Sequence, residues 1–582
     1  MLMTELETQS NKKEKKQYGE IIRKTTSLCP ECMKHIPADI VVDPETNWVM
    51  MVKNCKDHGE FKDKLSINPE DYKWQQGFTT SIGSTVNTTT KPESVSSGIK
   101  EVNKGCPYDC GLCSNHKSAP NICLIDITNR CNLTCPICFA NASAKGYIVE
   151  PSFDQIVQIM EHFRSMKPVP AVLLQLSGGE PTVRDDLPDI IRKGKELGFT
   201  ELMVTTNGVR FGKEPEFLKK CQEAGMNAIY LQFDATDAPE VWKKIRGVNL
   251  WPLKKRVIEN ARKARFFGIV LVPVIAKGIN DNQVGNILDY ARDNSDVVSG
   301  VIFQPVSLTG RISFEELMDI RYTTSDLKEA INKHTNGAIG QFYPIATTAK
   351  MTQLLAWFDE MPAFSMTSHQ DCGFCSIIII NDKGEWEALE DYFDVTGLIK
   401  WSNKVWDMVQ EREVPKPTGL LKGINLNDLG PIFSKIGEFV DDMTDLGYRQ
   451  IIKAYYFAGA ARFIKEPGKI LTSKTYQGFA RLVMNPNFNS AANFLHTRNL
   501  LISSMHFQDA YNFDLDRVCS CLVHYGVIDP DDPTKVREIP FCAMNTLHRP
   551  IIERQLAIKG KTAKKPEVIQ AEIEELLEKF QE

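Results

Sequence analysis

Short apolar runs alternate with amphipathic helical patterns over residues 122–340 of this chain. The runs fit buried strands, and the patterns between them, such as 154–163 and 253–267, repeat apolar residues at helical spacing. The predicted strands are Ile122–Thr128, Ala171–Ser177, Glu201–Asn207, Ala228–Ala235, Ile269–Ala276 and Gly300–Pro305. Six strand–helix units in a row predict an α/β fold whose parallel sheet, with right-handed crossovers, curls into a partial (β/α)6 barrel. In such folds the chemistry lies at the carboxyl ends of the strands.

The segments before the barrel differ from it in pattern. Residues 1–25 are polar and lysine-rich, which predicts a mobile tail. Residues 26–75 hold a short β-like stretch between two pairs of metal-ligand residues, which predicts a small metal-binding module. Residues 76–104 are rich in Ser, Thr and Gly, as linkers are.

The C-terminal region, residues 341–582, contains a long segment with helical spacing. Apolar residues recur at helical intervals over about 429–507, and we expect a last helix there that ends in Met505-His506-Phe507. Two interpretations remain open, an ordinary helical cap with its own core and an apolar channel over the barrel mouth.

Composition narrows the class of protein. The chain has 582 residues, which predicts two to four domains, and its net charge of −5 does not suggest a nucleic-acid binder. No run of about 18 uninterrupted apolar residues occurs, so no membrane-spanning helix is expected, although peripheral membrane contact stays open. The 16 cysteines cluster at metal-ligand spacing without a secretory signal, which favours a cytoplasmic protein that holds metals.

Three cysteines, Cys131, Cys135 and Cys138, follow the first predicted strand with the spacing C-x₃-C-x₂-C. Three thiolates can hold three irons of a 4Fe–4S cube and leave the fourth iron open to a chelating ligand. A zinc knuckle or buried thiols are the alternative interpretation.

Polar residues follow the next strands. We expect these residues to contact a cofactor on the open iron, with an ordinary turn or strand end as the alternative for the last three: Ser177, Gly178, Gly179, Glu180, Asn207, Gln232 and Asp234. Two glycines allow close backbone approach, and a glutamate can pair with an ammonium group. The cysteine spacing and the GGE motif together resemble the radical S-adenosylmethionine (SAM) superfamily. That resemblance implies SAM on the open iron, cleaved by one electron to a 5′-deoxyadenosyl radical.

Three further groups of metal ligands are predicted. The first group resembles a rubredoxin or zinc-ribbon site for one metal ion and consists of Cys29, Cys32, Cys55 and His58. Because a histidine stands where a fourth cysteine would be, both iron and zinc remain open as the metal. Residues 105–124 are expected to form a second 4Fe–4S site, with zinc as its alternative, and a third cube joins distant cysteines. The second set is Cys106, Cys110, Cys113 and Cys123; the third is Cys372, Cys375, Cys521 and Cys542, with Cys519 as the alternative to Cys521.

The order of these motifs is similar to that of the archaeal tetraether synthase family. The resemblance implies coupling of terminal methyl carbons of archaeol-type diether lipids, with a ferredoxin-like electron donor, at the inner face of the membrane. An auxiliary cluster would then trap a carbon radical. The alternatives are a radical SAM methyltransferase acting on a pterin precursor and, outside enzymes, an Fe–S electron carrier or redox sensor. A carrier would not need the GGE motif.

Overall fold

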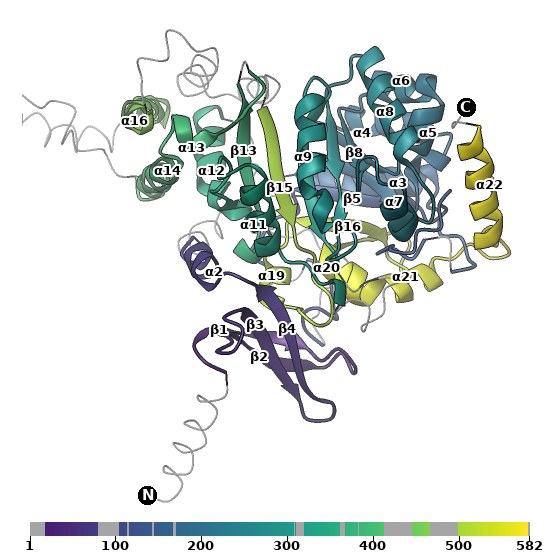
Figure 1. The fold of residues 1–582 in the computed structure, drawn as a ribbon, viewed down its shortest axis with the longest axis horizontal. Helices are drawn as coiled ribbons and strands as arrows, with labels where there is room; N and C mark the ends of the chain where they lie inside the picture. The colour runs from purple at the N-terminus through teal and green to yellow at the C-terminus, as the bar shows by residue number, and fades with distance from the viewer. Residues whose placement is uncertain are drawn as a thin grey trace, which may run out of the picture.

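The computed structural model describes most of the chain, in several stretches. These are residues 18–78, 104–112, 116–142, 145–166, 170–307, 309, 319–360, 367–381, 383–412, 445–465 and 499–579. The predicted tail up to residue 17, the linker from 79 to 103, Cys113 and most of the segment 429–507 lie outside the described residues. The described part forms a small antiparallel sheet, a large mixed sheet covered by helices, and a helical group beside one edge (Figure 1).

The N-terminal module is a four-stranded antiparallel sheet, which we call the ribbon, followed by a short helix. Its strands pair in chain order and bury an apolar core that includes Ile40, Val49 and Met51. The elements are β1 (Ile21–Leu28), β2 (His35–Val42), β3 (Val49–Cys55), β4 (Gly59–Ser66) and α2 (Pro69–Gln76). This confirms the small β module expected at the N-terminus.

Six parallel strands form the partial barrel, as the alternating pattern predicts. The strands are β5 (Ile122–Thr128), β6 (Leu173–Gly178), β7 (Glu201–Thr206), β8 (Ala228–Gln232), β9 (Ile269–Val272) and β11 (Val298–Pro305). The main covering helices are α3 (Phe153–Ser165), α4 (Leu187–Glu196), α6 (Pro215–Ala224), α8 (Trp251–Lys263) and α9 (Val284–Asp293). The predicted strand Ile269–Ala276 is divided, because Pro273 has no N–H for the ladder and separates β9 from β10 (Val274–Ile275).

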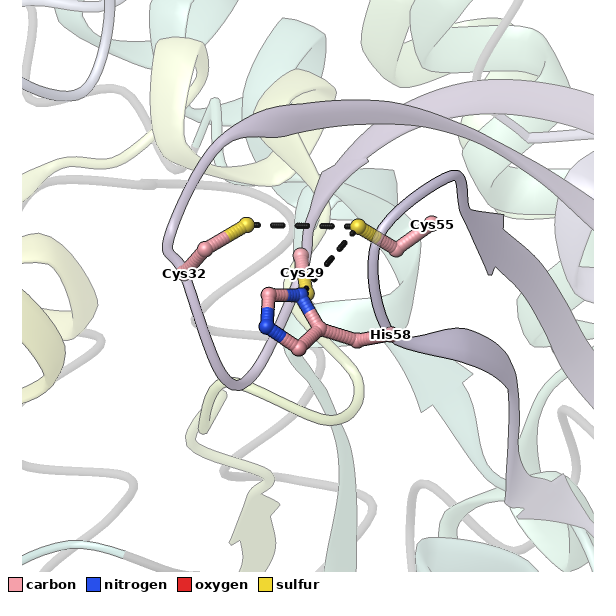
Figure 2. Close-up of side chains that lie close together, drawn as sticks. All are labelled: Cys29, Cys32, Cys55 and His58. Atoms are coloured by element: carbon pink, nitrogen blue, oxygen red, sulfur yellow. Dashed lines mark hydrogen bonds between the residues drawn. The ribbon is translucent and has the colours of Figure 1, made fainter.

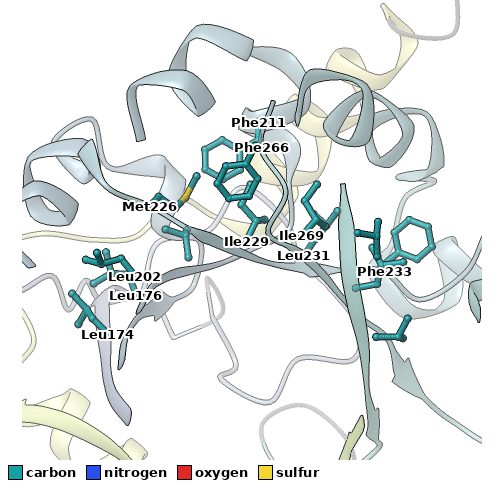
Figure 3. Packing of buried hydrophobic residues seen from close by; sticks show 14 of the residues in the cluster. Leu174, Leu176, Leu202, Phe211, Met226, Ile229, Leu231, Phe233, Phe266 and Ile269 are labelled. Atoms are coloured by element: carbon teal, nitrogen blue, oxygen red, sulfur yellow. The ribbon is translucent and has the colours of Figure 1, made fainter. Parts of the chain in front are cut away.

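Alternate strand positions separate the helix-covered face from the barrel interior. Leu174, Leu202 and Ile229 point toward the helices and are at most 3% exposed, within the core shown in Figure 3. Several intervening positions carry polar side chains, and Gln175 Nε2 donates to Thr205 Oγ1 at 2.8 Å. The face opposite the core is therefore equipped for polar contacts.

Strands from the C-terminal region extend the barrel sheet at both edges. Beyond β11 come β15 (Asn499–Met505), then β13 (Gly373–Ile380) with the short β12 (Tyr343–Pro344) and β14 (Trp386–Ala388). Beyond β5 come β16 (Val523–Ile528) and β17 (Val536–Pro540). Residues from the last part of the sequence therefore lie beside the first strand of the barrel.

The prediction of a helix that ends in Met505-His506-Phe507 is wrong, because the stretch before His506 forms the strand β15. β15 pairs with β11 on one side and with β13 on the other, so most of its residues are buried. A short apolar run of this kind does not distinguish a buried strand from a helix.

A group of helices packs beside this edge. α12 (Ala349–Phe358), α14 (Val395–Gln410) and α16 (Asp445–Ala460) share an apolar core that includes Trp401, Ile452 and Tyr456. Their described residues thus bury their apolar faces against one another. Among the described residues, no helix is both long and apolar enough to cross a membrane.

Arg321 joins the ribbon to the rest of the molecule through two buried carboxylates. Its guanidinium donates to Asp63 of β4 at 2.7 and 3.1 Å and to Asp509 at 2.9 Å. The three side chains are at most 3% exposed. Because the carboxylates are out of water, they depend on nearby cations for compensation.

Replacing Arg321 by Met should loosen the ribbon, because an uncompensated buried charge costs about 3–5 kcal/mol. Hydrogen exchange measured by mass spectrometry should show β4 amides exchanging roughly 100- to 5,000-fold faster. The matched control is Arg262→Met, which removes an exposed pair with Asp296 and should cost less than about 1 kcal/mol. Equal exchange of β4 in both variants would contradict this role.

Candidate active site

The loop that carries Cys131, Cys135 and Cys138 begins where β5 ends, at the barrel's carboxyl edge. Cys131 and Cys135 pack against buried residues that include Leu133 and Trp242. Burial raises the pKa of the Cys131 thiol, and the neighbouring Cys135 and Cys138 raise it further. The structure therefore places these predicted ligands near one another on one half-buried loop.

Gly178 and Gly179 serve the packing of this loop, which the sequence interpretation did not foresee. Gly179 N donates to Thr128 O at 2.7 Å, and Glu180 N donates to Arg130 O at 2.9 Å. Gly178 has φ +138°, and a Cβ on it would lie 2.0 Å from Thr128 O; one on Gly179 would lie 2.4 Å from Arg130 O. Only glycine permits this contact between the end of β6 and the cysteine loop.

Glu180 is a buried carboxylate held at the carboxyl ends of β6 and β7. Its Oε1 accepts from Thr182 Oγ1 at 2.5 Å and Thr206 Oγ1 at 2.7 Å, and its Oε2 accepts from Asn207 N at 2.7 Å. Burial raises its pKa, and these hydrogen bonds oppose the rise. A carboxylate oxygen has more than one acceptor position, so Oε2 retains capacity for an ammonium donor.

The other predicted cofactor residues have different tasks. Asn207 Nδ2 donates to Asn132 Oδ1 of the cysteine loop at 2.7 Å, and Ser177 is buried at the end of β6. Asp234 accepts from Arg246 at 2.6 and 2.9 Å and also pairs with Gln232. Asp234 therefore fixes the position of the Arg246 guanidinium.

Arg246 supports the cysteine loop directly. Its Nη1 donates to Ile137 O at 3.2 Å, and its positive charge and hydrogen bond partly offset the burial that raises the pKa of Cys135. A cation beside a thiolate stabilises it, so this pair of Arg246 and Asp234 favours ligation by Cys135.

Sequence reasoning missed Lys254, a buried lysine between the ends of β7 and β8. Its Nζ donates to Asn207 O at 2.6 Å and to Gln232 Oε1 at 3.0 Å. Burial lowers the pKa of Lys254 to about 7, and the charge of Asp234 opposes this. The available signal was its position next to Leu253 on the apolar face of α8, where a lysine is unusual.

The ribbon brings its four predicted ligands together (Figure 2). His58 Nδ1 lies 3.6 Å from Cys29 Sγ and 3.5 Å from Cys55 Sγ, and Cys32 Sγ lies 3.9 Å from Cys55 Sγ. Two hairpin ends supply the ligands, as in a tetrahedral one-metal site.

The second cysteine group differs from the predicted set. Cys519 Sγ lies 3.9 Å from Cys106 Sγ, and Cys110 is buried in the same apolar cluster that Cys106 packs against. Cys123 lies instead in the barrel core with Ile125 and Ile127, on the helix-covered face of β5. Spacing along the chain placed Cys123 next to this group, but strand alternation points its side chain elsewhere.

The third group contains three of its four predicted members near one another. The charges of Cys372 and Cys542 both act on Cys521, whose pKa burial raises. The guanidinium of Arg517 partly offsets the burial that raises the pKa of Cys372. Cys375 lies in β13 opposite Ser503 and Tyr343.

Comparison with known proteins agrees with this architecture. The family model described as Radical SAM superfamily matches residues 125–291, and the HMPTM N-terminal zinc ribbon domain matches residues 21–67. The 7,8-dihydro-6-hydroxymethylpterin dimethyltransferase of Methanocaldococcus jannaschii is 38% identical over 539 residues, 92% of this chain and 96% of that enzyme.

Other similarities are more restricted. A GTP 3′,8-cyclase of Limosilactobacillus fermentum is 33% identical over 186 residues, which cover 31% of this chain and 54% of the cyclase. The FeFe-hydrogenase maturase HydG from Carboxydothermus hydrogenoformans aligns with 62% of this chain and 80% of its own at 11% identity, with a TM-score of 0.30.

The expectation of a tetraether synthase with an archaeol-type lipid substrate is wrong, because the near-full-length relative is a pterin dimethyltransferase. The cysteine motifs report which cofactors a chain holds, whereas its substrate contacts residues scattered along the sequence. The family match and the near-full-length relative support an enzyme of the radical SAM type. The N-terminal module matches the zinc ribbon domain of the HMPTM family model. The chain therefore belongs to the radical SAM superfamily and, within it, to the family of the 7,8-dihydro-6-hydroxymethylpterin dimethyltransferase.

Proposed function

We propose that this protein is a radical SAM methyltransferase whose methyl acceptor is a pterin. The observation that carries the proposal is the relative of that activity, which is 38% identical along almost the whole of both chains. The barrel edge supports it, because three thiols and a buried carboxylate converge there.

The residues at that edge fit the cofactors that such an enzyme needs. Cys131, Cys135 and Cys138 would hold a 4Fe–4S cluster, and Glu180 would accept hydrogen bonds from the amino group of SAM. When bound, these cofactors supply one-electron cleavage of SAM and a radical that abstracts hydrogen from an unactivated carbon.

The protein supplies charge and position around them. Arg246 lies beside Cys135, and the charge of Lys254 also reaches this thiol. Thiolates carry negative charge, and two buried cations reduce the cost of burying it. The negative charges of Asp234 and Glu180 in turn offset the positive charges of Arg246 and Lys254.

Nine of the other cysteines would hold two auxiliary clusters and one mononuclear metal. Cys106, Cys110 and Cys519 would bind one cluster, and Cys372, Cys521 and Cys542 the other. The ribbon, whose family model is described as a zinc ribbon, would hold zinc at Cys29, Cys32, Cys55 and His58.

The activity test is anaerobic incubation of reconstituted protein with a strong reductant, 7,8-dihydro-6-hydroxymethylpterin and excess SAM. One SAM is cleaved to the radical, and a second SAM donates the methyl group and leaves as S-adenosylhomocysteine. Mass spectrometry should find methylated pterin and 5′-deoxyadenosine, and Cys135→Ala should form neither, because an incomplete cluster site cannot cleave SAM. Cleavage of SAM by the wild type without any methylated pterin would refute the proposed acceptor.

Glu180→Gln should weaken SAM binding about 10- to 100-fold, because a hydrogen bond to a charged group contributes roughly 1.5–3 kcal/mol. Equilibrium dialysis with labelled SAM measures this, and the cluster absorption should not change. Glu240→Gln, an exposed glutamate on the same barrel, is the matched control with unchanged affinity. Equal affinities for the two variants would remove Glu180 from the SAM site.

Cys519→Ser should lose about four irons per chain after anaerobic reconstitution, one cluster's content. Cys123→Ser should keep its full iron content while losing stability, because its side chain lies in the apolar core. Iron and zinc analysis with electron paramagnetic resonance distinguishes the two variants. Iron loss in Cys123→Ser alone would restore the ligand set expected from spacing.

A further inference from the structure

A cavity of about 250 Å³ lies beside the cysteine loop, between the barrel edge and the C-terminal segment. Gly178 and Gly179 of the GGE motif line it, together with Asp126 of β5. Tyr525 of β16 and Arg549 of α21 (Arg549–Gln555) also line it. The cavity is therefore adjacent to the motif expected to bind SAM.

A buried charged network lies in this cavity. Arg549 Nη1 donates to Asp126 Oδ2 at 2.6 Å and to Glu553 Oε1 at 3.0 Å, and its Nε donates to Asn545 Oδ1 at 2.8 Å. Arg549 is 5% exposed, and its Nη2 makes no hydrogen bond within the described part of the chain. A buried donor without a partner is costly, so an acceptor on a bound molecule would satisfy it.

The carboxylate of Asp126 complements that donor. An ionised carboxylate has about four acceptor positions, and the hydrogen bond from Arg549 uses one of them. Asp126 therefore keeps acceptor capacity in the cavity, next to a donor that lacks a partner. The pair matches a ligand edge on which hydrogen-bond donors and an acceptor lie side by side.

Much of the remaining lining is apolar, with Glu150 and Gln155 among its polar members. Tyr525 lines the cavity, and its ring lies between Phe541, stacked at 5.4 Å between centroids, and the Arg549 guanidinium, 5.0 Å from its centroid. The aliphatic lining residues are Ile159, Met544, Ile552, Leu556 and Ile558. Sites for drug-sized ligands are about 300–1,000 Å³, so this cavity admits a compact ring system rather than a long chain.

We propose that this cavity binds the pterin ring of the substrate and that Asp126 and Arg549 recognise its pyrimidinone edge. That edge presents a ring N–H beside an amino group, two donors for a carboxylate, and a neighbouring carbonyl oxygen for Arg549 Nη2. The assignment rests on the proposed function and names the part of the protein that selects the acceptor.

The test measures pterin binding separately from SAM binding. Reconstituted full-length protein with SAM is titrated with 7,8-dihydro-6-hydroxymethylpterin, followed by its fluorescence. Asp126→Asn should raise the pterin Kd about 10- to 100-fold and leave the SAM Kd unchanged, since the amide is isosteric but accepts with one oxygen only. Asp185→Asn, an exposed aspartate of the same barrel, is the control with unchanged Kd values.

A second ligand makes the test independent of any change in folding. The pteridine-2,4-dione analogue has a carbonyl group where the pterin has its amino group. Wild-type protein should bind the analogue at least 10-fold more weakly than the pterin, and Asp126→Asn should lose most of this preference. Ile558→Trp, which fills the cavity from a half-buried position, should weaken both ligands.

The outcomes separate this assignment from the proposed function. Wild-type protein that binds no pterin overturns both. Pterin binding that is equal in the wild type and in Asp126→Asn, with the same preference over the dione, overturns the cavity assignment and leaves the methyltransferase proposal standing.

Discussion

The backbone of residues 178–180 lies against the backbone of residues 128–130, and the geometry of the active site depends on this contact. Two hydrogen bonds join the segments, and any side chain on either glycine would collide with a carbonyl oxygen. The cysteine loop and Glu180 are therefore placed by one another. Asn207 N then ties the end of β7 to the same carboxylate. Three strand ends thus form a single unit at the edge of the barrel.

The extension of the sheet by late strands is the second organising feature. β16 pairs in parallel with β5, so residues 519–528 lie beside the strand that introduces the cysteine loop. This pairing brings Cys519 to Cys106 and places Tyr525 at the cavity beside the GGE motif. β15 extends the sheet at the other edge, where it pairs with both β11 and β13. Groups distant in sequence become neighbours because each joins the same sheet.

Buried arginines compensate negative charge at three places in the molecule. Arg246 accompanies Cys135, Arg517 accompanies Cys372, and Arg549 accompanies the acidic residues of the cavity. Each arginine is almost completely buried. Arginine keeps its charge in such surroundings and donates to several acceptors at once, which explains its use at all three places.

The sequence alone determined the elements that depend on local pattern. Six strands, their helices, the cysteine loop after β5 and the four ligands of the ribbon follow from periodicity and spacing, since neighbours in the chain supply them. Tertiary structure alone decided the rest. It placed Cys519 rather than Cys123 next to Cys106, because strand alternation turned the Cys123 thiol into the core and sheet pairing brought Cys519 close. It made 499–505 a strand because two partners flank it, and it placed Lys254 among the polar strand ends. Contacts between residues hundreds of positions apart have no characteristic spacing in the sequence. A substrate is recognised through such contacts, and for that reason the substrate predicted from the motifs was wrong.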